Sequence, residues 1–282
     1  RRFGKSLFLD PLAELFSGSR ELFTGLTAEE HWDWSRRYPV VRLSFNEGPL
    51  VNRSQLDAKI GEMLDENAAN LGVTCPAPTP SGRLRALILA AAAKHGERVV
   101  VLVDEYDKPI LDHLGDPELA RSMRDGLRDL YSVIKGADAH IRFAFLTGVS
   151  KFSKVSLFSG LNNLKDITVD ARYSALCGYT ERDLDTVFAS ELEGLDRTRI
   201  RTWYNGYNWT GEAVYNPFDV LLLLDARQFR TWWFETGTPD FLVQTLKAHG
   251  FFTPDLNQLR SSEALLSAFD VDQIAPEALL WQ

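Results

Sequence analysis

The chain has 282 residues, enough for one large or two small domains with a substantial core. Its hydrophobic fraction of 45% and charged fraction of 25% are ordinary for a globular protein, and its net charge of −8 argues against a generally basic surface for nucleic acid. The two cysteines, Cys75 and Cys177, argue against a disulfide framework or a zinc cluster. No apolar run has membrane-spanning length and no signal peptide is visible, so we expect a cytoplasmic protein without membrane contact.

The chain opens with RRFGKSLFLD, in which Gly4-Lys5-Ser6 matches the end of the phosphate-binding pattern G-x-x-x-x-G-K-[ST]. Such a tripeptide occurs by chance in roughly one chain in ten of this length. The apolar spacing of residues 7–18 predicts a helix directly after it, with Pro11 expected to kink that helix. Backbone N–H groups at the start of a helix, together with a lysine, form a binding site for phosphate.

The rest of the first half alternates between strand and helix patterns. The sequence predicts strands at 38–45, 98–107 and 141–150, a further extended piece at 166–170, and helices at 54–72, 82–96 and 117–136. Buried β runs between amphipathic helices are typical of an α/β fold with a parallel sheet.

A second motif, VVVLVDEYD, places Asp104 and Glu105 at the end of a buried strand. This is the Walker B arrangement, in which the aspartate would hold Mg²⁺ together with the Ser6 hydroxyl and the glutamate would polarise the attacking water. An acidic turn that merely caps a buried strand is the alternative for this motif taken alone.

The next buried strand ends at Thr147, where related ATPases carry a polar residue that senses the γ-phosphate. Lys151 and Lys154 follow, and one of them could neutralise charge in the transition state. A solvated basic loop is the alternative for either lysine.

Four stretches resemble, in order, the AAA-ATPase-like family of bacterial proteins: RRFGKSLFL, VVVLVDEYDKPIL, FLTGVSKFSKVSLFSGLNNLKDIT and the aromatic-rich YNGYNW…FRTWWFETGTPDFL. The resemblance covers about residues 1 to 246. Members usually begin with a divergent phosphate loop, Arg-Pro-Arg-Arg-Phe-Gly-Lys-Ser, and end in a PD-(D/E)XK nuclease-like domain. This chain departs from them at Pro11 and in having no strand before the loop, so we expect a fragment.

The resemblance implies a P-loop NTPase sheet flanked by helices that binds ATP with Mg²⁺. The residues it implies at the nucleotide are Arg2, Phe3, Gly4, Lys5, Ser6 and Leu7. The implied metal ligands are Ser6 and Asp104, and the implied catalytic residues are Glu105, Thr147 and Lys151. Asp107 and Lys108 follow the family's pattern, but the sequence gives them no role.

The predicted domains are an ATPase core lacking its first strand at 1–171, a helical or winged-helix-like lid at 172–250, and a linker toward an absent C-terminal domain at 251–282. Within the lid we expect a helix over 177–195 from a Thr180 cap, a hairpin turn at Asn205-Gly206, and a helix starting near Asn216-Pro217. The crowded aromatic residues of this segment either form its core or stack on nucleic-acid bases.

Three functions stay open on the sequence alone. The first is an ATP-binding and ATP-hydrolysing switch or motor that regulates a C-terminal effector domain. The second is a non-catalytic scaffold gated by nucleotide, with a protein partner or self-association. The third, by analogy only, is the ATPase part of a nucleic-acid-processing protein. The chain contains no Glu-x-Lys, so we assign it no nuclease activity.

Overall fold

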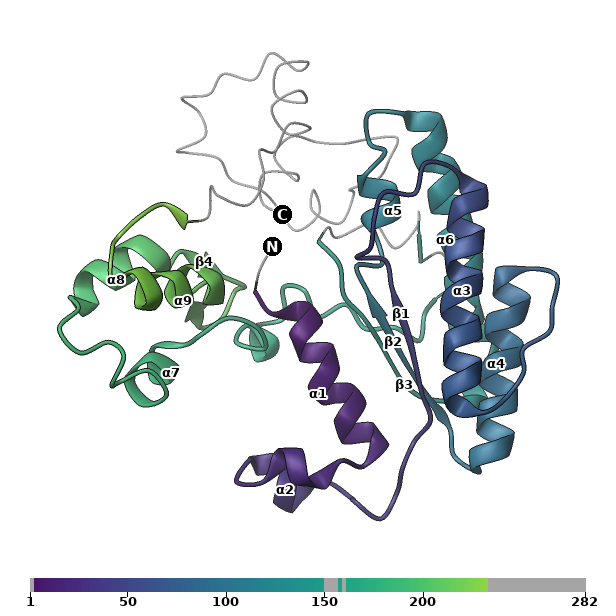
Figure 1. The fold of residues 1–282 in the computed structure, drawn as a ribbon, viewed down its shortest axis with the longest axis horizontal. Helices are drawn as coiled ribbons and strands as arrows, with labels where there is room; N and C mark the ends of the chain where they lie inside the picture. The colour runs from purple at the N-terminus through teal and green to yellow at the C-terminus, as the bar shows by residue number, and fades with distance from the viewer. Residues whose placement is uncertain (1–2, 150–156, 159–160, 233–282) are drawn as a thin grey trace. The chain divides into compact units, whose positions relative to one another are not determined.

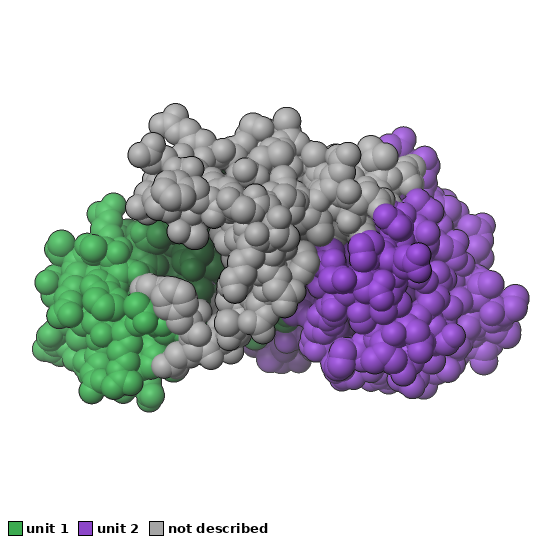
Figure 2. Space-filling view, turned by 90° about the horizontal axis from the view of Figure 1, so that it is seen from above, with its two compact units in different colours: residues 1–8, 165–240 green, residues 9–164, 241–282 purple. Residues whose placement is uncertain are grey.

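The computed structural model describes residues 3–149, 157–158 and 161–232. The chain divides into two compact units, coloured separately in Figure 2. Unit 1 consists of Arg1–Phe8 and Lys165–Asp240, and unit 2 of Leu9–Leu164 and Phe241–Gln282. Each unit is described by itself.

Unit 2 contains a parallel three-stranded sheet in the order β1-β2-β3 (Figure 1). The strands are β1 Val40–Ser44, β2 Val99–Asp104 and β3 Ile141–Leu146. All six residues of β2 are buried, whereas β3 is mostly half-buried. The predicted α/β class with a parallel sheet is confirmed, and the central strand is the one that carries the Asp-Glu motif.

Helices cover both faces of this sheet (Figure 1). On one face, Val99, Val101 and Val103 belong to the main core with α3 Arg53–Leu71, α4 Pro80–His95 and α6 Pro117–Gly136. On the other face, Val100 and Leu102 pack with residues of α1 Lys5–Ser17, among them Leu9, Ala13 and Phe16. Successive side chains of a strand point to opposite faces, so one apolar strand supplies two cores.

Local signals explain where the long helices begin and end. The Asn52 side chain accepts the Gln55 N–H at the start of α3, and Asp116 accepts the Leu119 N–H at the start of α6. Gly72 ends α3 in a left-handed conformation at φ 62°. The shorter helical turns of unit 2 are η1 Arg20–Phe23, α2 Thr27–His31, α5 Lys108–Leu111 and η2 Asp138–His140.

The outer edge of β1 is covered by the side chain of a helix. The buried Asn67 of α3 accepts the Arg42 N–H at 2.9 Å and donates to the Arg42 carbonyl at 2.8 Å. The Asn67 amide thus takes the place of a neighbouring strand. This pairing satisfies backbone groups that would otherwise be exposed for pairing with another chain.

The extended piece predicted at 166–170 is not a strand, and this prediction was wrong. The Asp166 side chain accepts the Thr168 N–H at 2.9 Å, and the Asp170 N–H donates to the Ile167 carbonyl at 3.2 Å. These local turn bonds occupy groups that a strand would offer to a neighbour.

Unit 1 contains short elements: η3 Ala171–Tyr173, α7 Glu181–Thr186, α8 Arg197–Tyr204, the hairpin β4 Tyr207–Asn208 with β5 Ala213–Val214, and α9 Pro217–Ala226. The predicted caps are present, because Thr180 and Asp183 form a capping box and Asn216 accepts the Phe218 N–H.

Three of the crowded aromatic residues are buried in the core of this unit: Tyr204, Tyr215 and Trp232. Their burial favours packing over base stacking. Trp233 and Phe234 lie outside the described residues.

Two boundaries in unit 1 differ from the prediction. The helix predicted over 177–195 ends at Thr186, and the carbonyls of Glu191 and Glu193 further along accept from the Arg227 guanidinium. The hairpin turn lies at 209–212 and not at 205–206, with Thr210 in a left-handed conformation at φ 67°.

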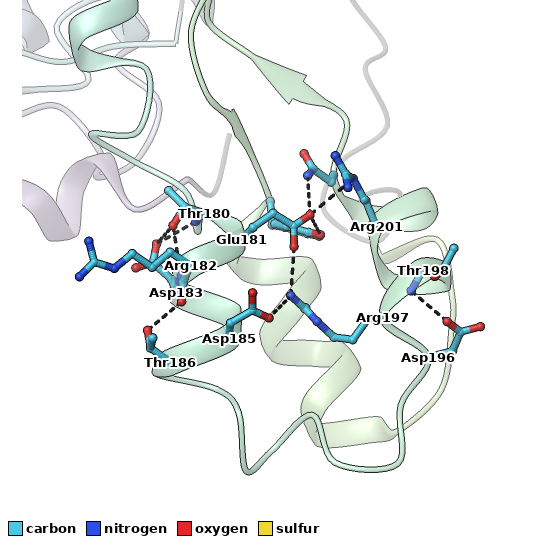
Figure 3. A network of polar contacts seen from close by, with 12 residues as sticks. Thr180, Glu181, Arg182, Asp183, Asp185, Thr186, Asp196, Arg197, Thr198 and Arg201 are labelled. Carbon is cyan, nitrogen blue, oxygen red and sulfur yellow. Dashed lines mark hydrogen bonds and ion pairs between the residues drawn. The ribbon is translucent and has the colours of Figure 1, made fainter.

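A polar network around Glu181 connects α7 and α8 of unit 1 with Tyr215, the residue after β5 (Figure 3). Its carboxylate accepts the Tyr215 hydroxyl at 2.6 Å and an N–H of Arg197 at 3.0 Å, and Arg197 also pairs with Asp185 at 2.7 Å. Burial of the ring and the hydrogen bond and negative charge of Glu181 raise the pKa of Tyr215 to about 12.

In the described part of the chain, no helix has the length and apolar character needed to cross a membrane. Cys75 is buried and Cys177 half-buried, and both are free thiols in the structure.

The raised pKa of Tyr215 predicts a loss of stability at alkaline pH. The unfolded-state pKa is about 10, so the contribution of the neutral phenol is complete below that pH and is lost as the pH rises toward about 12. We expect Tyr215→Phe to remove this dependence of stability on pH. The difference in unfolding free energy between wild type and Tyr215→Phe should then change by roughly 1–3 kcal/mol between about pH 10 and about pH 12. Urea unfolding at a series of pH values measures it, with the surface variant Tyr173→Phe as control. An unchanged difference would contradict the prediction.

Candidate functional site

The residues of the phosphate-loop pattern lie at the start of α1. Gly4 has φ +85°, a left-handed conformation that favours glycine, and the helix begins at Lys5. The Phe8 N–H donates to the Gly4 carbonyl at 2.8 Å and closes the first turn. The N–H groups before Phe8 have no intrahelical acceptor, since the first turn of any helix leaves them unpaired. This geometry suits an anion in front of Lys5 and Ser6.

Phe3 anchors this loop within unit 1. Its ring is buried and contacts Tyr207 and Trp209 edge-on, with centroid distances of 4.5 Å and 6.0 Å. Burial raises the pKa of the Cys177 thiol, and the positive charge of Lys5 partly offsets this increase. Tyr207 and Trp209, which the sequence suggested only as core or stacking aromatics, therefore support the loop.

In unit 2, polar residues stand at the carboxyl ends of all three strands. Ser44 is the register partner of Asp104, and the Thr147 N–H donates to the Val103 carbonyl at 2.9 Å. Asp104 and Thr147 are each only 6% exposed. The hydroxyl oxygens of Ser44 and Thr147 are buried and have no hydrogen-bond partner among the described residues. Ligands of parallel α/β sheets bind at this edge, and unsatisfied buried hydroxyls fit a ligand there.

Glu105 follows Asp104 in a strained conformation. Its φ of +50° is rare for a residue with a side chain, and its N–H donates to the Asp104 carboxylate at 3.0 Å. This bond holds one oxygen of the Asp104 carboxylate. Among the described residues no group of three or more His, Cys, Asp or Glu is placed to hold a metal ion. A single carboxylate is the donor set typical of Mg²⁺ that is also bound by substrate phosphates.

The structure adds Ser44, which sequence reasoning missed, and gives a contact to Asp107, to which the sequence assigned no role. Ser44 carried no signal except its place at the end of a strand. Asp107 is fully buried and accepts the Val149 N–H through both carboxylate oxygens, at 3.1 and 3.0 Å. The only signal for it was the Asp-Glu-Tyr-Asp spacing.

The predicted site residues thus fall into two groups. Phe3, Gly4, Lys5, Ser6 and Leu7 lie in unit 1, and Asp104, Glu105 and Thr147 come together at the sheet edge of unit 2. That these groups act on one nucleotide stays a prediction. Arg2 and Lys151 lie outside the described residues, as does Lys154.

Residues 1–158 match the family model described as "Predicted AAA-ATPase", and the chain belongs to this AAA-ATPase-like family. It is also 64% identical over all 282 residues to a protein of Azotobacter chroococcum mcd 1 described as "Uncharacterized protein in vnfD 5'region". The chain spans 55% of the length of that relative. No solved structure matches the chain.

Membership in this family confirms the resemblance inferred from the motifs and indicates an ATP-binding module. The family match covers the stretch that includes Gly4-Lys5-Ser6, Asp104 and Thr147.

The conformation of Glu105 predicts an unusual substitution pattern. At φ +50°, glycine is tolerated better than alanine, so we expect Glu105→Gly to be more stable than Glu105→Ala by about 1 kcal/mol. Asp112 is a matched control, since its φ of −64° lies in the right-handed helical region, where alanine should be the more stable. Urea unfolding of the four variants measures both differences. The same order of stability for the glycine and alanine variants at positions 105 and 112 would contradict a strained backbone at Glu105.

Proposed function

We propose that the chain is an ATP-hydrolysing module in which the phosphate loop at α1 and the acidic turn after β2 act on one nucleotide. The observation that carries this proposal is the carboxyl edge of the sheet in unit 2. There, Asp104 stands between two buried hydroxyls at the ends of adjacent parallel strands, and neither hydroxyl has a hydrogen-bond partner among the residues that the structure describes. Leaving a buried hydroxyl without a partner costs about 1–3 kcal/mol, a cost that a bound phosphate or its water would offset.

Each residue has a role that its surroundings support. The Lys5 ammonium donates to the β- and γ-phosphate oxygens, beside the free N–H groups of the first turn of α1. Mg²⁺, held by Ser6 and Asp104, would neutralise charge on the phosphates. The Thr147 hydroxyl donates to the γ-phosphate, and the Glu105 carboxylate orients the attacking water and draws off its proton as the bond between the β- and γ-phosphates breaks.

We further propose that hydrolysis drives a switch acting on an effector elsewhere in the complete protein. The support is that the Azotobacter chroococcum relative extends well beyond the matched stretch, which is 55% of its length. A nucleotide-gated scaffold that binds ATP without hydrolysing it is the alternative, and turnover separates the two.

Nucleotide binding should depend on Lys5. We expect Lys5→Ala to weaken ATP binding to the complete protein by roughly 1.5–3 kcal/mol, the free energy of a lost charge-assisted hydrogen bond. Isothermal calorimetry with ATP and Mg²⁺ measures it, and Lys135→Ala, at an exposed position near the end of α6, is the matched control. Equal affinities for wild type and Lys5→Ala would refute the assignment of the loop.

Glu105 should affect chemistry and leave binding largely intact. Glu105→Gln preserves the size of the side chain and removes its charge, so we expect turnover to fall about 100-fold or more with little change in ATP affinity. Phosphate release under saturating ATP measures turnover, and the exposed Glu118→Gln in α6 is the control. Wild-type turnover in Glu105→Gln would make the residue structural, and binding without any turnover in wild type would favour the scaffold.

A further inference from the structure

We propose that Asp107 is a positioning residue for ATP hydrolysis, which holds the chain after β3 and so sets the place of the Thr147 hydroxyl. The inference rests on the proposed function, because it assigns to Asp107 a part in the chemistry at the same sheet edge. Asp107 itself is fully buried, so it acts through its neighbours.

The carboxylate of Asp107 is used in an unusual way. Asp107 stands at the N-cap of α5, where an aspartate normally accepts an N–H of its own helix, but its side chain makes no such cap bond. Instead, both of its oxygens accept the Val149 N–H, 42 residues further along the chain. The Asp107 carboxylate therefore joins the turn after β2 to the loop after β3.

A glycine allows this contact. A β-carbon on Gly148 would lie 2.5 Å from an oxygen of Asp107 and 2.6 Å from the Tyr106 ring, so no other residue fits without a shift. The Tyr106 N–H also donates to the Thr147 carbonyl at 3.0 Å. Residues 147–149, which follow β3, therefore contact Tyr106 and Asp107 in the turn after β2.

The turn is itself held in place from the helical layer. The hydroxyl of Tyr131, buried in α6, donates to the Tyr106 carbonyl at 3.0 Å. Burial and the negative charge of Asp107 raise the pKa of Tyr131 well above its usual value, so its hydroxyl stays protonated and keeps donating.

These contacts hold the backbone around Thr147, and its hydroxyl has no hydrogen-bond partner among the described residues. A hydrogen-bond donor that is held in place before the ligand binds does not have to reorganise during the reaction. This preorganisation is the source of the catalytic effect of donors that stabilise a transition state. Asp107 supplies that preorganisation from a neighbouring loop.

The test is a double-mutant cycle on ATP turnover of the complete protein. Asp107→Asn weakens the contact with Val149 at constant size, and Thr147→Val removes the hydroxyl. We expect each single variant to lower kcat about tenfold or more, with the KM for ATP within about threefold of wild type. The double variant should match the slower single variant within about twofold, since Asp107 has nothing to position once the hydroxyl is gone.

Asp112→Asn is the matched control, because Asp112 lies in the same segment and pairs at the surface with Lys108, and its kcat should equal that of wild type. If Asp107→Asn does not fold, Gly148→Ala displaces the same carboxylate from the other side and replaces it in the cycle. Losses that multiply in the double variant overturn the inference and leave the proposed function standing. A wild-type protein that neither binds nor hydrolyses ATP overturns both.

Discussion

The structure of the candidate site depends on the backbone pairing that joins the ends of β2 and β3. The Thr147 N–H donates to Val103, and the Tyr106 N–H donates back to the Thr147 carbonyl. Thr147 is thereby bonded on both sides to the chain that carries Asp104, so the hydroxyl and the carboxylate belong to one rigid edge. Parallel strands place their carboxyl ends together, and these two bonds continue that pairing beyond the last residue of β3.

Backbone strain and unsatisfied hydroxyls lie together at this edge, next to a well-packed sheet interior. Glu105 has a positive φ, and in the described part of the chain the Ser44 and Thr147 hydroxyls have no hydrogen-bond partner, yet β2 is buried on both faces and the edge of β1 is covered by Asn67. Domains are stable by only about 5–15 kcal/mol, so such local costs persist only where the surroundings are well ordered. That distribution is typical of a site prepared for a ligand.

Unit 1 shows how a short loop is supported by residues distant in sequence. Phe3 packs on the hairpin of β4 and β5, about 200 residues further along the chain. The Glu181 network connects α7 and α8 with Tyr215, the residue after that hairpin. The start of α1 therefore has its own hydrophobic anchor, and Gly4 is set between the buried Phe3 and the first helical turn.

The sequence by itself determined the elements that depend on local rules. The α/β class, the strands around Val101 and Phe143, and the helix starts at Thr180 and Asn216 follow from periodicity and capping, which involve residues only a few positions apart. It also placed Asp104, Glu105 and Thr147 at the ends of buried strands, because the end of an apolar run is visible in the sequence, and their role at a nucleotide stays a prediction. Only the tertiary structure decided that Arg227 bonds to the Glu191 carbonyl and that Asp107 bonds to Val149. Those outcomes depend on contacts between side chains and backbone groups that are 36 and 42 residues apart, and no local pattern specifies such partners.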